Sequence, residues 1–87
     1  MEDVFEGIVR ARLVVAECTG RNPNVLYELG MAHTIGKRTA LLSQNESDIP
    51  FDLRRFRFCI YQDNSTGYPI LHKFLQETIR DTVGQAV

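Results

Sequence analysis

The residues best suited to chemistry in this sequence lie within one short stretch, from Thr19 to Glu28. Asn22 and Asn24 flank a proline, and Glu28 follows Asn24 by four residues, which is one helical turn. A carboxylate at such a position, partly shielded from water, can attack a sugar carbon and form a glycosyl ester. The alternative is that Glu28 is solvated or pairs with a cation, and the residues alone leave both readings open.

The loop before Glu28 offers donors and acceptors to a ligand. Unpaired amides in the first turn of a helix favour oxygen-rich ligands. In open α/β sheets, ligands collect where loops lead from the carboxyl ends of strands into helices. We therefore predict a ligand-binding set composed of Thr19, Gly20, Asn22, Asn24 and Tyr27.

Other chemistries lack the residues they need. The sequence has neither GxGxxG nor GxxxxGK[ST], so we predict no dinucleotide or P-loop cofactor site. Cys18 and Cys59 cannot form a zinc framework, and we interpret both as small buried hydrophobes. His33 and His72 have no recognisable nucleophile partner and are predicted to be structural or solvated. We predict no metal site and no cofactor.

Composition narrows the class of protein. The chain has 87 residues, 44% of them hydrophobic, which suits one domain over residues 1–87. A net charge of -1 provides no uniform positive field, so nucleic acid is not a predicted partner. The apolar runs are far shorter than a membrane helix needs, and the acidic first residues do not match a signal peptide. The predicted location is the cytoplasm.

Hydrophobic periodicity predicts alternating helices and strands. Asn22 is expected to cap a helix that Pro23 opens and Gly36 ends, and Asp48 is a candidate cap for a helical turn at 49–53. The other expected elements are a helix over 1–10, strands over 13–16, 39–43 and 57–61, and a last helix from Pro69 whose apolar stripe is Leu71, Phe74, Leu75, Ile79 and Val83. This alternation predicts a three-layer α/β fold with a short parallel sheet of about three strands and helices on both faces.

Residues 13–33, LVVAECTGRNPNVLYELGMAH, together with IPFDLR at 49–54, resemble the nucleoside 2-deoxyribosyltransferase superfamily and its bacterial relatives. The resemblance implies a flavodoxin-like fold and a nucleoside or nucleotide ligand. It also implies that Glu28 is the nucleophile in cleavage or transfer of an N-glycosidic bond. Relatives begin with a strand, a helix and a strand that this chain lacks, and their missing first strand would lie beside residues 13–17.

Three functions remain open, two that follow from this resemblance and one from a different class of protein. The leading one is a nucleoside-binding domain that is catalytic when a partner completes the pocket, and the second is a ligand-sensing module of the same ancestry without turnover. The third is an oligomerising interaction protein in which the loop serves packing only. An open sheet edge beside residues 13–17 also predicts self-association, most simply as a two-fold dimer.

Overall fold

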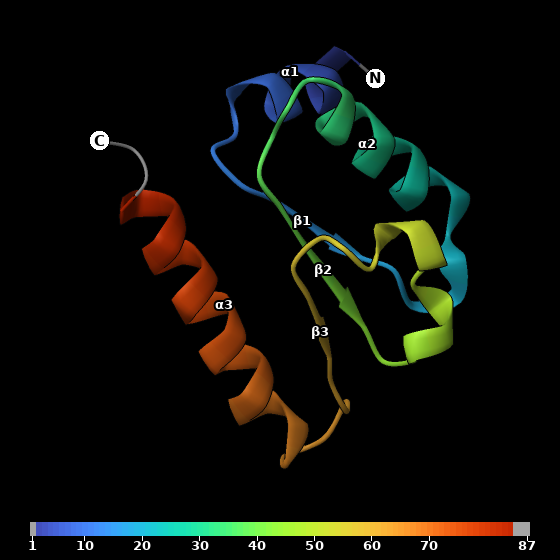
Figure 1. Cartoon of the computed structure of the whole chain (residues 1–87), viewed down its shortest axis with the longest axis vertical. Helices are drawn as coiled ribbons and strands as arrows, with labels where there is room; N and C mark the ends of the chain where they lie inside the picture. The colour runs from blue at the N-terminus through green and yellow to red at the C-terminus, as the bar shows by residue number, and fades with distance from the viewer. Residues whose placement is uncertain (1, 85–87) are drawn as a thin grey trace.

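The computed structural model describes the backbone of residues 2–84 and the side chains of residues 4–84. Helices and strands alternate along the chain, as the hydrophobic periodicity predicts (Figure 1). The elements are α1 (Glu2–Arg10), β1 (Val14–Glu17), the 3-10 turn η1 (Thr19–Arg21), α2 (Pro23–Thr34), β2 (Thr39–Ser43), the 3-10 turns η2 (Glu46–Asp48) and η3 (Phe51–Leu53), β3 (Phe58–Ile60) and α3 (Gly67–Gly84).

The three strands form one parallel sheet in the order β1-β2-β3. Val14 of β1 is paired with Thr39 of β2, and Leu41 of β2 is paired with Phe58 of β3. Every residue of β2 is buried, as expected for a central strand covered on both faces. All three carboxyl ends consequently lie at one edge of the sheet, where the loops after the strands begin.

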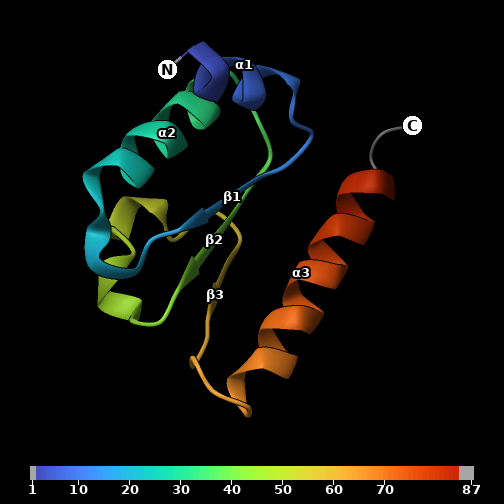
Figure 2. The same ribbon diagram turned by 180° about the vertical axis from the view of Figure 1, so that it is seen from behind.

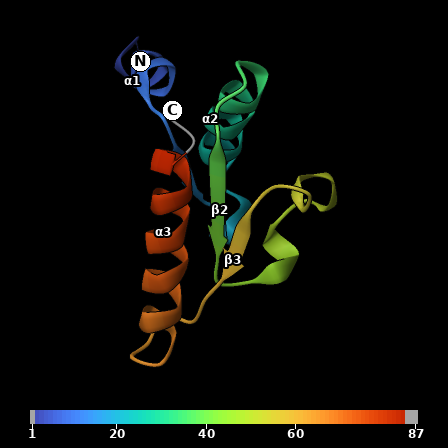
Figure 3. The ribbon, with the colours of Figure 1, turned by 60° about the vertical axis from the view of Figure 1, so that its left-hand side comes forward.

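Helices cover both faces of this sheet, which confirms the predicted α/β class. Seen from behind, the strands separate α2 from α3 (Figure 2), and the side view places α2 and the 3-10 turns away from α3 (Figure 3). The buried cluster between the sheet and α2 consists of Ala16, Cys18, Leu29, Leu41 and Ile49. Among residues 2–84, no helix is long and apolar enough to cross a bilayer.

Both ends of α2 form as the sequence predicts. The Asn22 side chain accepts a hydrogen bond from the amide of Asn24, at 2.9 Å, so Asn22 is the N-cap. At the other end Gly36 adopts a φ of +75°, a left-handed conformation that favours glycine. The amides of Gly36 and Lys37 then donate to the carbonyls of His33 and Ala32, which satisfies acceptors left over at the helix end.

The structure corrects the predicted apolar stripe of α3. Ile79 and Val83 are 54% and 55% exposed, whereas Thr78 and Thr82 are the buried residues in the second half of the helix. Each of these threonine hydroxyls donates to the carbonyl four residues earlier, so it is buried without losing its hydrogen bond. The helix also begins at Gly67, two residues before the proline.

Two smaller expectations were wrong as well. Asp48 does not cap the turn at 51–53, because its carboxylate accepts the amide of Gly20 instead. The strand predicted at 13–16 runs from Val14 to Glu17 and is not buried on both faces, since the Val15 side chain is 45% exposed.

Candidate functional site

The loop after β1 is fastened to the loop after β2. The Thr19 hydroxyl accepts the amide of Gln44 at 2.9 Å, and the amide of Gly20 donates to Asp48 at 2.8 Å. The Arg21 guanidinium adds a bond to the carbonyl of Ser47 at 2.9 Å. Gly20 has a φ of +79°, which a residue with a Cβ rarely adopts. These contacts hold the start of α2 in a fixed position at the carboxyl edge of the sheet.

Asn24 and Glu28 lie on one flank of α2, one turn apart. Asn24 is exposed and Glu28 is half-buried. Within residues 2–84, neither side chain makes a hydrogen bond or an ion pair. Helical periodicity puts Met31 and Ile35 on the same side of the helix as Glu28, and both line a groove with Phe5 of α1. Glu28 does not itself line that groove, and its carboxylate has no partner among the described residues.

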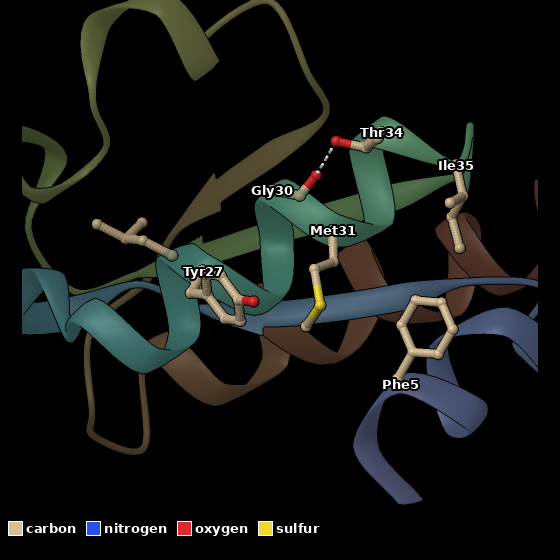
Figure 4. Close-up of a pocket in the computed structure, with 7 residues that line it drawn as sticks. Phe5, Tyr27, Gly30, Met31, Thr34 and Ile35 are labelled. Atoms are coloured by element: carbon tan, nitrogen blue, oxygen red, sulfur yellow. Dashed lines mark hydrogen bonds between the residues drawn. The ribbon is translucent and has the colours of Figure 1, made fainter. Parts of the chain in front are cut away.

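A shallow apolar groove of about 500 Å³ separates α1 from α2. Figure 4 shows Tyr27 at one end of this groove and the Phe5 ring facing Met31 and Ile35 at the other. Tyr27 is 68% exposed, and of the six predicted site residues it alone lines the groove. The structure thus separates the predicted set into a polar part at the start of α2 and an aromatic residue that points elsewhere.

Sequence reasoning missed a pair of groups at the same edge of the sheet. Glu17 ends β1, and its carboxylate accepts both the amide of Thr19, at 2.7 Å, and the hydroxyl of Tyr61, which follows β3. This hydrogen bond, assisted by burial, raises the pKa of Tyr61 to about 12. The pair joins the two outer strands across β2. Its signal in the sequence is a polar residue at the end of each of two predicted strands whose carboxyl ends share one edge.

His33 has a structural environment, as predicted. Its Nε2 lies 2.9 Å from the Thr39 hydroxyl, and its ring stacks on Phe56 with centroids 3.9 Å apart. Burial, with a smaller contribution from the Arg55 charge, lowers the pKa of His33 and favours the neutral ring. Neutral imidazole in a stack of this kind contributes to packing.

The two cysteines are also packing residues in this fold. Both are buried and unbridged, and burial raises the pKa of each thiol, which keeps it in the unreactive protonated form. Among residues 2–84, no group of three or more His, Cys, Asp or Glu side chains is placed to hold a metal ion.

No protein-family model, curated protein or solved structure matches this chain. The class that fold and site define is an α/β domain with a three-stranded parallel sheet and a polar helix start at the carboxyl edge of that sheet.

Proposed function

We propose that this chain is a nucleoside- or nucleotide-binding domain related to nucleoside 2-deoxyribosyltransferases. The ligand lies against the start of α2, close to Thr19, Gly20, Asn22 and Asn24, whereas Tyr27 lines the separate groove beside α1. When a partner completes the pocket, Glu28 is the nucleophile in cleavage or transfer of the N-glycosidic bond. The observation that carries the proposal is the carboxylate of Glu28, a half-buried residue, which no described residue pairs and which lies one turn from the equally unpaired side chain of Asn24.

The surroundings of Glu28 suit a polar sugar ligand. The N-cap uses only the side-chain oxygen Oδ1 of Asn22, so the NH₂ group of the same side-chain amide is left for a ligand. Asn24 offers both an acceptor and a donor, which match the hydroxyl groups of a sugar. Loops at the carboxyl edge of a parallel sheet are the usual location of such ligands in α/β proteins.

The reaction proceeds in two displacements. A Glu28 oxygen attacks the anomeric carbon, the C–N bond breaks, and the base leaves with the bonding electron pair and takes up a proton from solvent. A water molecule or the nitrogen of a second base then attacks the same carbon and releases the carboxylate, losing a proton to solvent. Hydrolysis and transfer therefore differ only in the second nucleophile.

A ligand-sensing module without turnover is the second candidate function. It is favoured by the structural use of Thr19 and Gly20: the Thr19 hydroxyl and the Gly20 amide bind the loop after β2, and the Thr19 amide donates to Glu17. Because the polar groups of Thr19 and Gly20 are already hydrogen-bonded within the protein, the loop can bind a ligand through Asn22 and Asn24 but does little to stabilise a transition state.

Ligand-observed magnetic resonance against nucleosides, free bases and nicotinamide dinucleotide, followed by product analysis of each binder, tests the proposal. We expect nucleoside or nucleotide binding, and Glu28→Gln should abolish any release of free base while leaving the protein folded. Glu77→Ala, at an exposed position of α3, is the matched control and should change neither property. Binding without turnover supports the sensing module. Turnover that persists in Glu28→Gln would show that Glu28 is not the nucleophile, and the absence of any binding overturns both candidates.

A further inference from the structure

Among the residues that the structure describes, no strand pairs with the outer side of β1, which is one edge of the sheet. The amides of Val14 and Cys18 donate to the carbonyls of Arg38 and Leu42, so these residues face β2. Peptide groups alternate in direction along a strand, and the N–H and C=O groups of Leu13, Val15 and Glu17 must therefore point away from β2. No lysine, proline or bulge protects this edge between residues 13 and 17.

Exposed apolar side chains accompany this edge. Val15 is 45% exposed, although it lies within the apolar run at 13–16. Beside it, Leu13 lines a groove with Ile79 and Val83 of α3, which are both more than half exposed. Because Leu13 and Val15 alternate with the residues that pack on α2, all four side chains lie on the α3 face.

The charges along the edge are arranged with opposite signs at its two ends. Arg12, which is exposed, precedes β1, and Glu17, whose carboxylate also accepts the Tyr61 hydroxyl, ends it. Arg10 is already paired with Glu6 at 3.8 Å. An antiparallel copy of the same strand places the basic end of one copy beside the acidic end of the other. A parallel copy would bring like charges together, so the charges select the antiparallel arrangement.

We propose that a second copy of this chain pairs antiparallel with β1 about a two-fold axis at Val15. In this register Val15 faces Val15 of the second copy, and Leu13 faces Glu17. Each facing pair exchanges two backbone hydrogen bonds, about six in total. The result is a continuous six-stranded sheet on which the exposed Ile79 and Val83 of each copy flank the joint.

A second copy fits this edge better than a helix or a loop does. The outward peptide groups require a strand as partner, because a helix has already used its own N–H and C=O groups. The register about Val15 makes the edge self-complementary in its backbone hydrogen bonds and in the contact between the two Val15 side chains, as a closed two-fold interface requires. This proposal does not depend on the proposed function, since it uses none of the residues of the nucleoside site.

Sedimentation velocity from about 1 to 100 µM tests the proposal with the whole chain. We expect a dimer whose Kd rises at least ~30-fold in Val15→Lys, because a two-fold interface sets the two introduced ammonium groups against each other. Phe51→Lys is the control, since Phe51 is 86% exposed on η3, which precedes the opposite edge strand, and this variant should retain the parent Kd.

Ile79→Lys changes a side chain that is already exposed, and it should also weaken the dimer. This variant keeps the proposal testable if Val15→Lys does not fold. Amide hydrogen exchange should show Val15 and Glu17 becoming protected as the concentration rises. A monomer throughout this range overturns the proposal. A dimer that both Val15→Lys and Ile79→Lys leave intact, or that Phe51→Lys dissociates, places the contact elsewhere and overturns it equally.

Discussion

Replacement of Leu29 by alanine tests the phase of α2, and with it the placement of Glu28. Leu29 is 1% exposed and belongs to the cluster formed with Ala16, Cys18, Leu41 and Ile49. These neighbours belong to two strands and to the loops that follow them, which are fixed by backbone hydrogen bonds, so they cannot close fully over a cavity. We expect a loss in the upper part of the usual range for such substitutions, about 3–5 kcal/mol.

A loss of this size is a large fraction of the stability of an 87-residue domain, which is on the order of 4–13 kcal/mol. Thermal unfolding followed by circular dichroism should show Tm falling by roughly 12–30 °C. The adjacent Gly30→Ala is the matched comparison. A Cβ at Gly30 meets nothing within 4 Å, so alanine there should stabilise the helix by about 0.5–1 kcal/mol. If Leu29→Ala melts with the parent protein, the helix phase is wrong and Glu28 does not face the proposed site.

Three further predictions concern single interactions. Asn22→Ala should lower the free energy of unfolding by about 1 kcal/mol through loss of the N-cap, measured by urea denaturation, and unchanged stability would contradict the cap. The lowered pKa of His33 means that the folded state disfavours its protonation, so stability should fall as the pH drops below about 6.5 and level off below the lowered pKa; His33→Gln should remove this dependence. The pKa of Tyr61 is raised, so the folded state favours the protonated hydroxyl. The contribution of Tyr61 to the free energy of unfolding should therefore be complete below pH 10 and disappear as the pH rises toward 12. Tyr61→Phe should abolish that alkaline loss in a pH series of melting curves, and an identical loss in the variant would contradict the Glu17–Tyr61 bond.

The sequence predicted those parts of the fold that depend on local chemistry. The bounds of β2 are the predicted ones, because its apolar centre at 40–42 lies between polar segments. The start and end of α2 were also predicted correctly. Asn22 and Pro23 favour the N-cap and the first helical position, and Gly36 favours the left-handed conformation that follows the end of a helix.

The errors arose where burial depends on distant elements. The periodicity of α3 identifies an apolar stripe, but only the sheet decides how much of it is covered, and three strands leave Ile79 and Val83 exposed. Thr78 is buried without any hydrophobic signal because its hydroxyl is satisfied within the helix. The hydrogen bond between Glu17 and Tyr61 joins residues far apart in the chain, and it follows only from the observed strand order.

Chemical-shift mapping of the isotopically labelled chain with added nucleosides tests the central claim most directly, because it locates binding whether or not turnover occurs. The account predicts concentration-dependent shifts at the backbone amides of Asn22, Asn24 and Glu28, and none at Lys73 on the exposed side of α3. Shifts confined to other parts of the molecule, or no shifts at millimolar nucleoside, would contradict a nucleoside site at the start of α2.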